Sequence, residues 1–171
     1  NLETFYFAAK IARGEYKNTR FYSISGDVPN PGVYEFAETM PIRQVLEFSQ
    51  NLPEQPFFVQ AGGGASGTIL LENELDNPLA GAGCIVVHDM ARTDPRKLGL
   101  EWAEFFISEN CGKCVPCREG VYRLREIFLQ EKVDVAKTKE IVVLMKAASF
   151  CPFGKGAANA FEPLLGKLDL Q

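Results

Sequence analysis

A short cysteine run, Cys111-Gly-Lys-Cys114-Val-Pro-Cys117, organises this chain, and a fourth cysteine, Cys151, follows it after 33 intervening residues. Three thiolates spaced by three residues on a tight loop can each bind a different iron of a cubane, and a distant cysteine can bind the fourth iron. The sequence therefore predicts one 4Fe-4S cluster, a carrier of single electrons, with Cys111, Cys114, Cys117 and Cys151 as its metal ligands.

Zinc is the main alternative metal for four thiolates. Structural zinc sites more often use paired C-x2-C knuckles, so a third cysteine directly after one knuckle is surplus. The spacing favours an iron-sulfur cluster over zinc. Four buried free thiols are a weaker interpretation still, because such regular spacing has no packing reason. A scaffold module with structural zinc stays open as the alternative function.

Three cations flank the predicted ligands in the sequence, namely Lys113, Arg118 and Lys155. Each of them could offset the negative charge of thiolates and cluster, or could be a solvated surface residue. Lys113 lies between two ligands. We expect it to raise the reduction potential of the cluster, because reduction adds a negative charge that a nearby cation stabilises.

The composition narrows the class of protein. The net charge of −4 over 171 residues argues against a nucleic-acid partner, which requires a basic surface. No apolar run approaches the roughly 20 residues of a membrane-spanning helix, so we expect a soluble chain without direct membrane insertion. Clustered cysteines that bind metal fit a reducing, cytoplasmic location. The chain opens without a methionine, and we expect it to be a piece of a longer protein.

The residues before the cysteines alternate between short helical and strand patterns. Residues 1–18 are typical of a short connector helix, and residues 21–24 and 33–36 flank a turn rich in Pro, Gly and Asn, which predicts a hairpin. Thr39 is the expected cap of a helix with Pro41 in its first turn. Two more strands are expected at 57–59 and 84–87, which gives a small mixed α+β unit.

After Pro95 the hydrophobic residues take helical spacing. Leu98, Trp102, Phe105 and Phe106 share one face, which core packing explains better than an electron relay. Further helices are expected around 121–128, around 141–148 with Asp134 or Thr138 as cap, and around 157–164, where Pro163 predicts a kink or a break. These segments predict a small helical bundle.

A glycine loop offers a second alternative function. Gly62-Gly63-Gly64-Ala65-Ser66-Gly67 satisfies G-x-G-x-x-G after a strand, and Asp89 ends another strand, as an NAD-binding domain would require. Residues 68–83 leave little room for the crossover helix of such a domain. No catalytic group is evident, because His88, the one histidine, has no adjacent nucleophile. Cys84 is interpreted as a buried residue of a strand.

The cysteines belong to a longer pattern, Phe105-Phe106-x-x-Glu109-x-Cys111-Gly112-x-Cys114-x-Pro116-Cys117-Arg118-Glu119-Gly120, followed by Ser149-x-Cys151-x-x-Gly154 and by Ala157-Ala158 with Pro163. Upstream lie Asn1-Leu2-Glu3-Thr4, Ser25-Gly26-x-Val28 and Pro31-Gly32-x-Tyr34. Together these residues resemble the C-terminal part of the NADH-binding flavoprotein subunit of complex I. Related diaphorase subunits of NAD(P)-linked hydrogenases and formate dehydrogenases share the motif.

The resemblance implies an α+β fold class in three parts: a connector helix over 1–18 from a flavin domain, a β-grasp (SLBB-like) domain over 19–92, and a 4Fe-4S-binding helical bundle over 96–171. The implied function is to relay electrons from NADH-reduced flavin to further iron-sulfur centres. FMN and NADH would bind only the parent full-length subunit. The implied partners are the flavin/NADH domain of that subunit, a thioredoxin-like 2Fe-2S subunit and a further iron-sulfur subunit, held at the inner face of the membrane.

Overall fold

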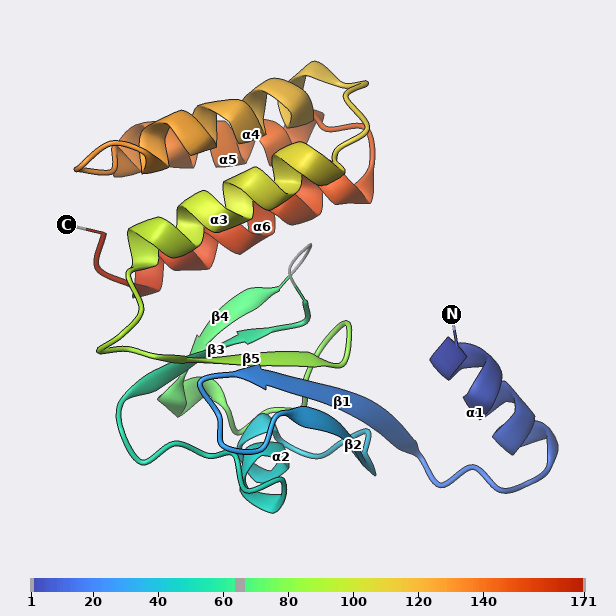
Figure 1. Ribbon diagram of the computed structural model, residues 1–171. Coiled ribbons are helices and arrows are strands. Elements are labelled where there is room, and N and C mark those ends of the chain that lie inside the picture. Colours follow the sequence, from blue (N-terminus) through green and yellow to red (C-terminus); the bar gives the residue numbers. More distant parts are fainter. Residues whose placement is uncertain (1, 64–66, 171) are drawn as a thin grey trace.

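The computed structural model describes residues 2–63 and 67–170 and has an α+β fold, in which helices stack above a mixed sheet (Figure 1). The elements of the sheet region are α1 (Leu2–Ala12), β1 (Thr19–Gly26), β2 (Gly32–Ala37), α2 (Ile42–Phe48), β3 (Phe57–Ala61), β4 (Thr68–Leu71), a 3-10 helix η1 (Glu72–Glu74) and β5 (Cys84–Asp89). The helical region consists of α3 (Pro95–Glu109), α4 (Val115–Phe128), α5 (Val135–Ala148) and α6 (Pro152–Lys167).

The described strands form one five-stranded sheet in the order β2-β1-β5-β3-β4. The predicted hairpin is confirmed, because β1 and β2 pair antiparallel, with Tyr22 opposite Tyr34. On its other side β1 runs parallel to β5, and β3 runs antiparallel to both β4 and β5. Alternation along β1 buries Tyr22 and Ile24 against α2, which covers the lower face of the sheet in Figure 1.

Helix starts confirm one predicted cap and correct another. Asp134 caps α5, where its carboxylate accepts a hydrogen bond from the Lys137 amide at 3.0 Å. Thr39 does not cap α2, because that helix begins after Pro41 and has no side-chain cap. The first amides of α2 instead donate to the carbonyls of Asn77 and Leu75 across the fold. A tertiary contact therefore satisfies a helix start for which the sequence predicts a local side chain.

Pro163 corrects a second expectation. The last helix, α6, is continuous from Pro152 to Lys167 with Pro163 inside it, so the break predicted there is absent. The proline removes one amide from the helical hydrogen-bond ladder. Burial of Ala160, Phe161 and Leu164 on the inward face stabilises the helix around that position.

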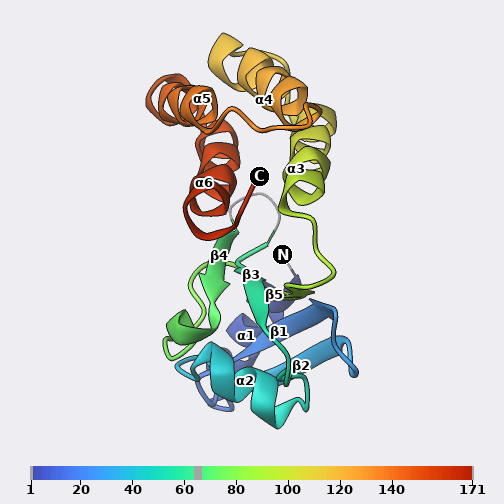
Figure 2. The ribbon, with the colours of Figure 1, turned by 90° about the vertical axis from the view of Figure 1, so that its left-hand side faces the viewer.

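The helices and the sheet share part of one core. Phe58 and Ile69 from the sheet belong to the same cluster of buried residues as Trp102, Phe106 and Phe161 of the helices. In Figure 2, α3 and α6 lie nearest the sheet, with α4 and α5 above them. The domain limits expected from the sequence stay a prediction.

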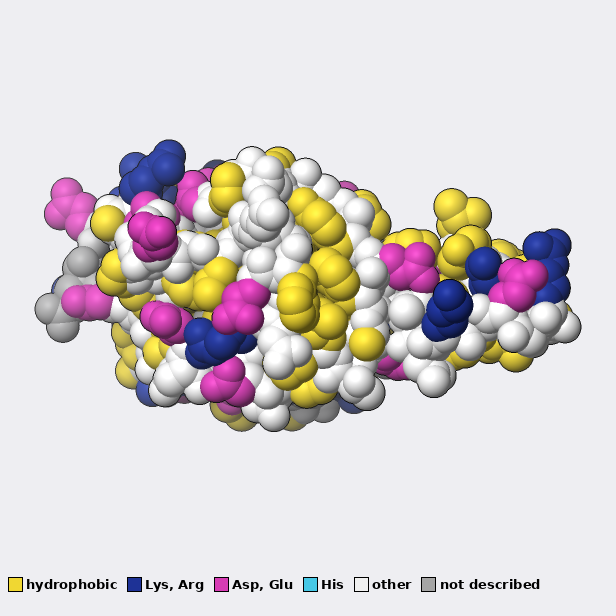
Figure 3. All heavy atoms as spheres, turned by 90° about the horizontal axis from the view of Figure 1, so that it is seen from below, with side chains coloured by type: hydrophobic (Ala, Val, Ile, Leu, Met, Phe, Trp, Pro, Cys, Tyr) yellow, Lys and Arg dark blue, Asp and Glu magenta, His cyan; other side chains and the backbone are white. Residues whose placement is uncertain are grey.

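The opposite face of the sheet region carries apolar surface. Seen from below in Figure 3, hydrophobic side chains gather in a band across the middle of the molecule. Phe48 of α2 is 65% exposed, and its ring centroid lies 6.4 Å from that of Phe36 in β2. At the far end of β1, α1 packs through Tyr6 and Phe7 on Phe21.

In the part of the chain that the structure describes, no helix has both the length and the apolar character required to cross a membrane.

Candidate metal centre

The four predicted ligands line one pocket, where α3 ends and where α4 and α6 begin. The pocket has a volume of about 240 Å³. Cys114 and Cys117 are buried in its wall, whereas Cys111 and Cys151 are exposed at its edge. The remaining lining residues are Glu109, Asn110, Gly112, Lys113, Arg118 and Phe153. The fold therefore brings Cys151 to the cysteine run across 33 residues of chain.

The loop that carries Cys111 is fixed from both sides. Asn110 ends α3, and its amide nitrogen donates to the carbonyl oxygens of Phe106 and Ile107 at 2.9 and 2.7 Å. Its side-chain oxygen accepts a hydrogen bond from the Gly112 amide at 2.9 Å. Gly112 has a φ of +69°, which favours glycine, and its carbonyl accepts from Arg118 Nη1 at 3.0 Å. The turn between Cys111 and Cys114 is thus held by α3 and α4 together.

Two of the predicted ligands lie directly at helix N-termini. Cys114 immediately precedes α4, and Cys151 immediately precedes α6. Each helix has a proline in its first turn, Pro116 or Pro152, where the missing amide costs no intrahelical hydrogen bond. The positive ends of two helix dipoles therefore point at the pocket, and they favour thiolates and an anionic group there.

Amide donors and burial set the charge of the inner thiols. Hydrogen bonds from the backbone amides of Phe150 and Cys117 lower the pKa of Cys114. Burial, with added repulsion from Cys114, Cys151 and Cys111, raises the pKa of Cys117 to about 11. Four thiolates therefore require positive charge inside the pocket, which metal ions provide when they replace the thiol protons.

The geometry fits a cluster better than a single ion. Within residues 2–63 and 67–170, no group of three or more His, Cys, Asp and Glu side chains is arranged to hold a metal ion. A single zinc ion requires its thiolates about 2.3 Å from one point. Four cysteines around a pocket of about 240 Å³ instead suit a group of several metal atoms, which spreads its ligands.

Packing at the start of α6 depends on Gly154. A Cβ atom placed there would lie 2.6 Å from Ser149 Oγ and 3.0 Å from Cys117 Cβ, both closer than ordinary contacts. Glycine at this position lets the first turn of α6 approach the Cys117 side of the pocket. Ser149, the residue after α5, is buried beside it.

The predicted cations have different surroundings. Lys113 and Lys155 are exposed, and only Lys113 of the two lines the pocket. Arg118 binds the Gly112 carbonyl and forms an ion pair with Glu119, whose Oε1 lies 2.8 Å from its Nε. Arg118 therefore has a structural part in the ligand loop, which the sequence left open.

The residues for which the sequence favours a structural role do not line the cysteine pocket. Cys84 is in β5, where burial raises its pKa. His88 stacks on Phe58 with 4.8 Å between ring centroids, and burial lowers its imidazole pKa. Trp102 and Phe106 are core residues as expected, but Phe105 is substantially exposed.

The glycine loop lacks the setting of an NAD site. The strands on either side of it, β3 and β4, pair antiparallel. The strand that ends at Asp89, β5, also pairs antiparallel with β3. A dinucleotide site of this type needs parallel strands joined by a helix. Gly62 and Gly63 have positive φ values, and Gly64, Ala65 and Ser66 lie outside the described residues.

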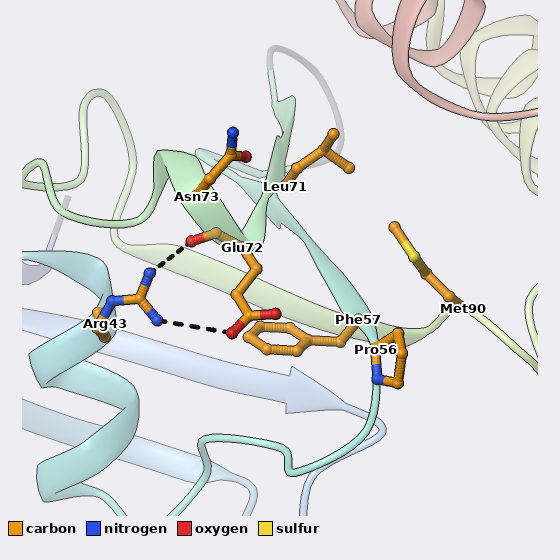
Figure 4. Close-up of a pocket in the computed structure, with 7 residues that line it drawn as sticks. All are labelled: Arg43, Pro56, Phe57, Leu71, Glu72, Asn73 and Met90. Atoms are coloured by element: carbon orange, nitrogen blue, oxygen red, sulfur yellow. Dashed lines mark hydrogen bonds and ion pairs between the residues drawn. The ribbon is translucent and has the colours of Figure 1, made fainter.

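A larger pocket of about 470 Å³ lies in the sheet region (Figure 4). Arg43 points toward it but is already engaged, donating to the Glu72 carbonyl at 2.6 Å and to Asp76 Oδ1 at 2.7 Å. The pocket is also lined by the apolar side chains of Pro56, Leu71 and Met90. The four-cysteine pocket is therefore the better candidate for a functional site.

Sequence reasoning missed the supporting residues of this site. Asn110, Gly154 and Ser149 act through contacts that spacing alone does not reveal. The one signal that could have found Ser149 and Gly154 was their place in the longer motif around the cysteines, whereas Asn110 stands at an unspecified position of that motif.

Known proteins resemble this chain in sequence, most specifically over the helical region. Residues 97–168 match the family described as NADH-ubiquinone oxidoreductase-F iron-sulfur binding region. The F subunit of the NADH-quinone oxidoreductase of Streptomyces coelicolor is 32% identical over 155 residues, which cover 81% of this chain and 34% of that protein. The HndC subunit of the NADP-reducing hydrogenase of Solidesulfovibrio fructosivorans is 27% identical over 181 residues, covering 93% and 36%.

A solved structure has a similar fold over most of this chain. The crystal structure of NAD+-reducing NiFe-hydrogenase in the H2-reduced state superposes with a TM-score of 0.75 at 28% identity, over 92% of this chain and 30% of that one. The chain spans about a third of the length of the curated relatives that it matches.

Proposed function

We propose that the chain is an electron-transfer module, because residues 97–168 match the family described as NADH-ubiquinone oxidoreductase-F iron-sulfur binding region. It holds one 4Fe-4S cluster through Cys111, Cys114, Cys117 and Cys151. The observation that supports this assignment most directly is the common pocket of the four thiols at the N-termini of α4 and α6.

The chain's own residues bind and orient the cluster. Cys114 and Cys117 fix its buried side, while Asn110 and Arg118 hold the loop that presents Cys111. When bound, the cluster supplies a centre that takes up and releases one electron at a time. The exposed positions of Cys111 and Cys151 leave one side of the pocket open to a redox partner.

The path of the electrons is proposed from the relatives. The electrons come from NADH-reduced flavin and pass to further iron-sulfur centres, with FMN and NADH bound by the parent subunit. The partners are the flavin/NADH domain of that subunit, a thioredoxin-like 2Fe-2S subunit and a further iron-sulfur subunit. The names of the relatives, one from a quinone oxidoreductase and one from a hydrogenase, support this class of complex. A location on the cytoplasmic side of the membrane is part of the same proposal.

The parts of the chain have corresponding tasks in this proposal. Residues 1–18 connect to the flavin domain, residues 19–92 form a β-grasp (SLBB-like) domain, and residues 96–171 carry the cluster. The sheet region and the helices α3 to α6 support this division, although they share buried residues at their contact.

Metal analysis tests the proposal. The chain, purified anaerobically, should contain about four iron and four sulfide per chain and should give an electron paramagnetic resonance signal when reduced. Stoichiometric zinc without iron or sulfide would reject the electron-transfer module in favour of a structural-zinc scaffold.

A further inference from the structure

A buried hydroxyl near the cysteines has no hydrogen-bond partner among the described residues. Ser149 follows α5, its side chain is 4% exposed, and its Oγ makes no hydrogen bond to any described residue. Its backbone is fixed, because the Ser149 amide donates to the Met145 carbonyl at 3.1 Å. A buried hydroxyl normally has a partner, since leaving one unpaired costs free energy.

Comparable hydroxyls in this fold are satisfied locally. Ser49 also follows a helix and is 5% exposed, yet its Oγ donates to the Leu46 carbonyl at 3.1 Å. Thr138, buried in α5, donates to the Asp134 carbonyl at 2.7 Å. Ser149 therefore differs from hydroxyls in similar positions, because no described residue satisfies its Oγ.

The hydroxyl lies beside the inner wall of the cysteine pocket. Ser149 Oγ and Cys117 Cβ are 2.6 and 3.0 Å from the same point, the place of the missing Cβ of Gly154. The two atoms are thus at most about 5.6 Å apart. Because Gly154 has no Cβ, no side chain occupies the space between Ser149 Oγ and Cys117 Cβ at that point.

The pocket wall beside Ser149 offers sulfur acceptors. Cys114 and Cys117 are both buried there. The Cys117 sulfur is a deprotonated thiolate once it binds metal. A hydroxyl carries one O–H donor, and an anionic sulfur accepts it well.

We propose that the Ser149 hydroxyl donates a hydrogen bond to a sulfur on the Cys117 side of the 4Fe-4S cluster and thereby raises its reduction potential. The inference rests on the proposed function, since it requires the cluster. Reduction adds negative charge to the sulfurs, so a donor there stabilises the reduced form more than the oxidised form.

The test compares Ser149→Ala with the native chain, both purified anaerobically with their clusters. The variant should shift the one-electron reduction equilibrium about tenfold toward the oxidised form, which is about 59 mV toward lower potential. Ser149→Thr keeps the hydroxyl and should return the potential toward the native value. Ser49→Ala removes a hydroxyl of similar burial from the sheet region and should leave the potential unchanged.

A spectroscopic measurement tests the contact itself. Pulsed electron paramagnetic resonance of the reduced native chain in D2O should detect an exchanged deuteron coupled to the cluster, and Ser149→Ala should lack that coupling. Absence of any such deuteron in the native chain would overturn the inference, whatever the variant does to folding.

Different outcomes would contradict the proposed function and the inference about Ser149. A native chain that assembles no cluster would overturn both the proposed function and this inference. An intact native cluster whose potential is the same in Ser149→Ala would overturn the inference alone.

Discussion

The five cysteines are chemically alike but stand in different surroundings. Cys114 lies in the pocket wall at the start of α4, whereas Cys84 lies in β5 and does not line the pocket. Replacing Cys114 by Ala should abolish or degrade the cluster, because one iron loses its thiolate. Iron content and the resonance signal of the reduced chain measure this effect. Cys84→Ala is the matched control, and equal losses in both variants would show that the ligands are misassigned.

Lys113 offers a second test at a single residue. Its exposed side chain lines the pocket between two ligands, so its charge acts on the cluster partly through solvent. Lys113→Gln should lower the potential by on the order of tens of millivolts at low salt, and by less at high ionic strength. Voltammetry at two salt concentrations checks both effects. Lys155→Gln is the comparison, because Lys155 is exposed but does not line the pocket.

Some residues of the candidate site could be predicted from the sequence, and others could not. The spacing of Cys111, Cys114 and Cys117 marked them as ligands, because a local loop fixes their separation. Asn110 and Ser149 gave no such signal. Their contribution depends on which helix end lies next to them, and that is set by packing across the fold.

At the scale of elements, α3 and α4 pack closely at a glycine, Gly99. A Cβ atom at Gly99 of α3 would lie 2.2 Å from Cε1 of Phe128 in α4. Gly99→Ala should therefore lower the free energy of unfolding by about 1–3 kcal/mol, despite the better helix propensity of alanine. Denaturant unfolding measures the change.

Gly166 supplies the control for that substitution. It lies in α6, and apart from its chain neighbours and the nearby backbone of α6 itself, no described atom comes within 4 Å of the place that a Cβ would take. Gly166→Ala should therefore be neutral or stabilising by up to about 1 kcal/mol. Equal destabilisation of both variants would show that the Phe128 contact does not limit the packing of α3.

Elements were predictable where a local pattern decides them. Alternation and turn residues predicted the β1–β2 hairpin, and helical spacing with Asp134 predicted α5. The strand β4 was not predicted, because its four residues pair with β3 and depend on that partner. The predicted cap of α2 and a break of α6 at Pro163 were wrong for the same reason: distant carbonyls and core contacts outweigh local preference.

At the scale of the whole molecule, one partly buried contact joins the helices to the sheet. The Lys167 ammonium at the end of α6 donates to the Ile69 carbonyl at 2.8 Å and to both carboxylate oxygens of Glu74 at 2.7 and 2.6 Å. Ile69 and Phe58 extend the helical core into the sheet beside it. Such a link ties the C-terminal end of α6 to β4 and η1.

The acid end of that link predicts a pH dependence. The hydrogen bond from Lys167, with a second from the Leu71 amide, lowers the pKa of Glu74 below its ordinary value of 4.5. A lowered folded-state pKa means that the unfolded chain binds the proton more readily, so the stabilisation is complete above pH 4.5 and is lost as pH falls through the lower folded value. The free energy of unfolding should therefore differ between the native chain and Glu74→Gln at neutral pH, and the difference should shrink at acid pH. Denaturant unfolding at several pH values measures this difference in the free energy of unfolding.

Glu54→Gln is the control, because Glu54 is at an exposed position before β3. Its free energy of unfolding should differ little from that of the native chain at any pH. A difference for Glu74→Gln that stays constant down to acid pH would mean that its carboxylate charge does not join helices to sheet, and that the shared core around Phe58 and Ile69 holds them together instead.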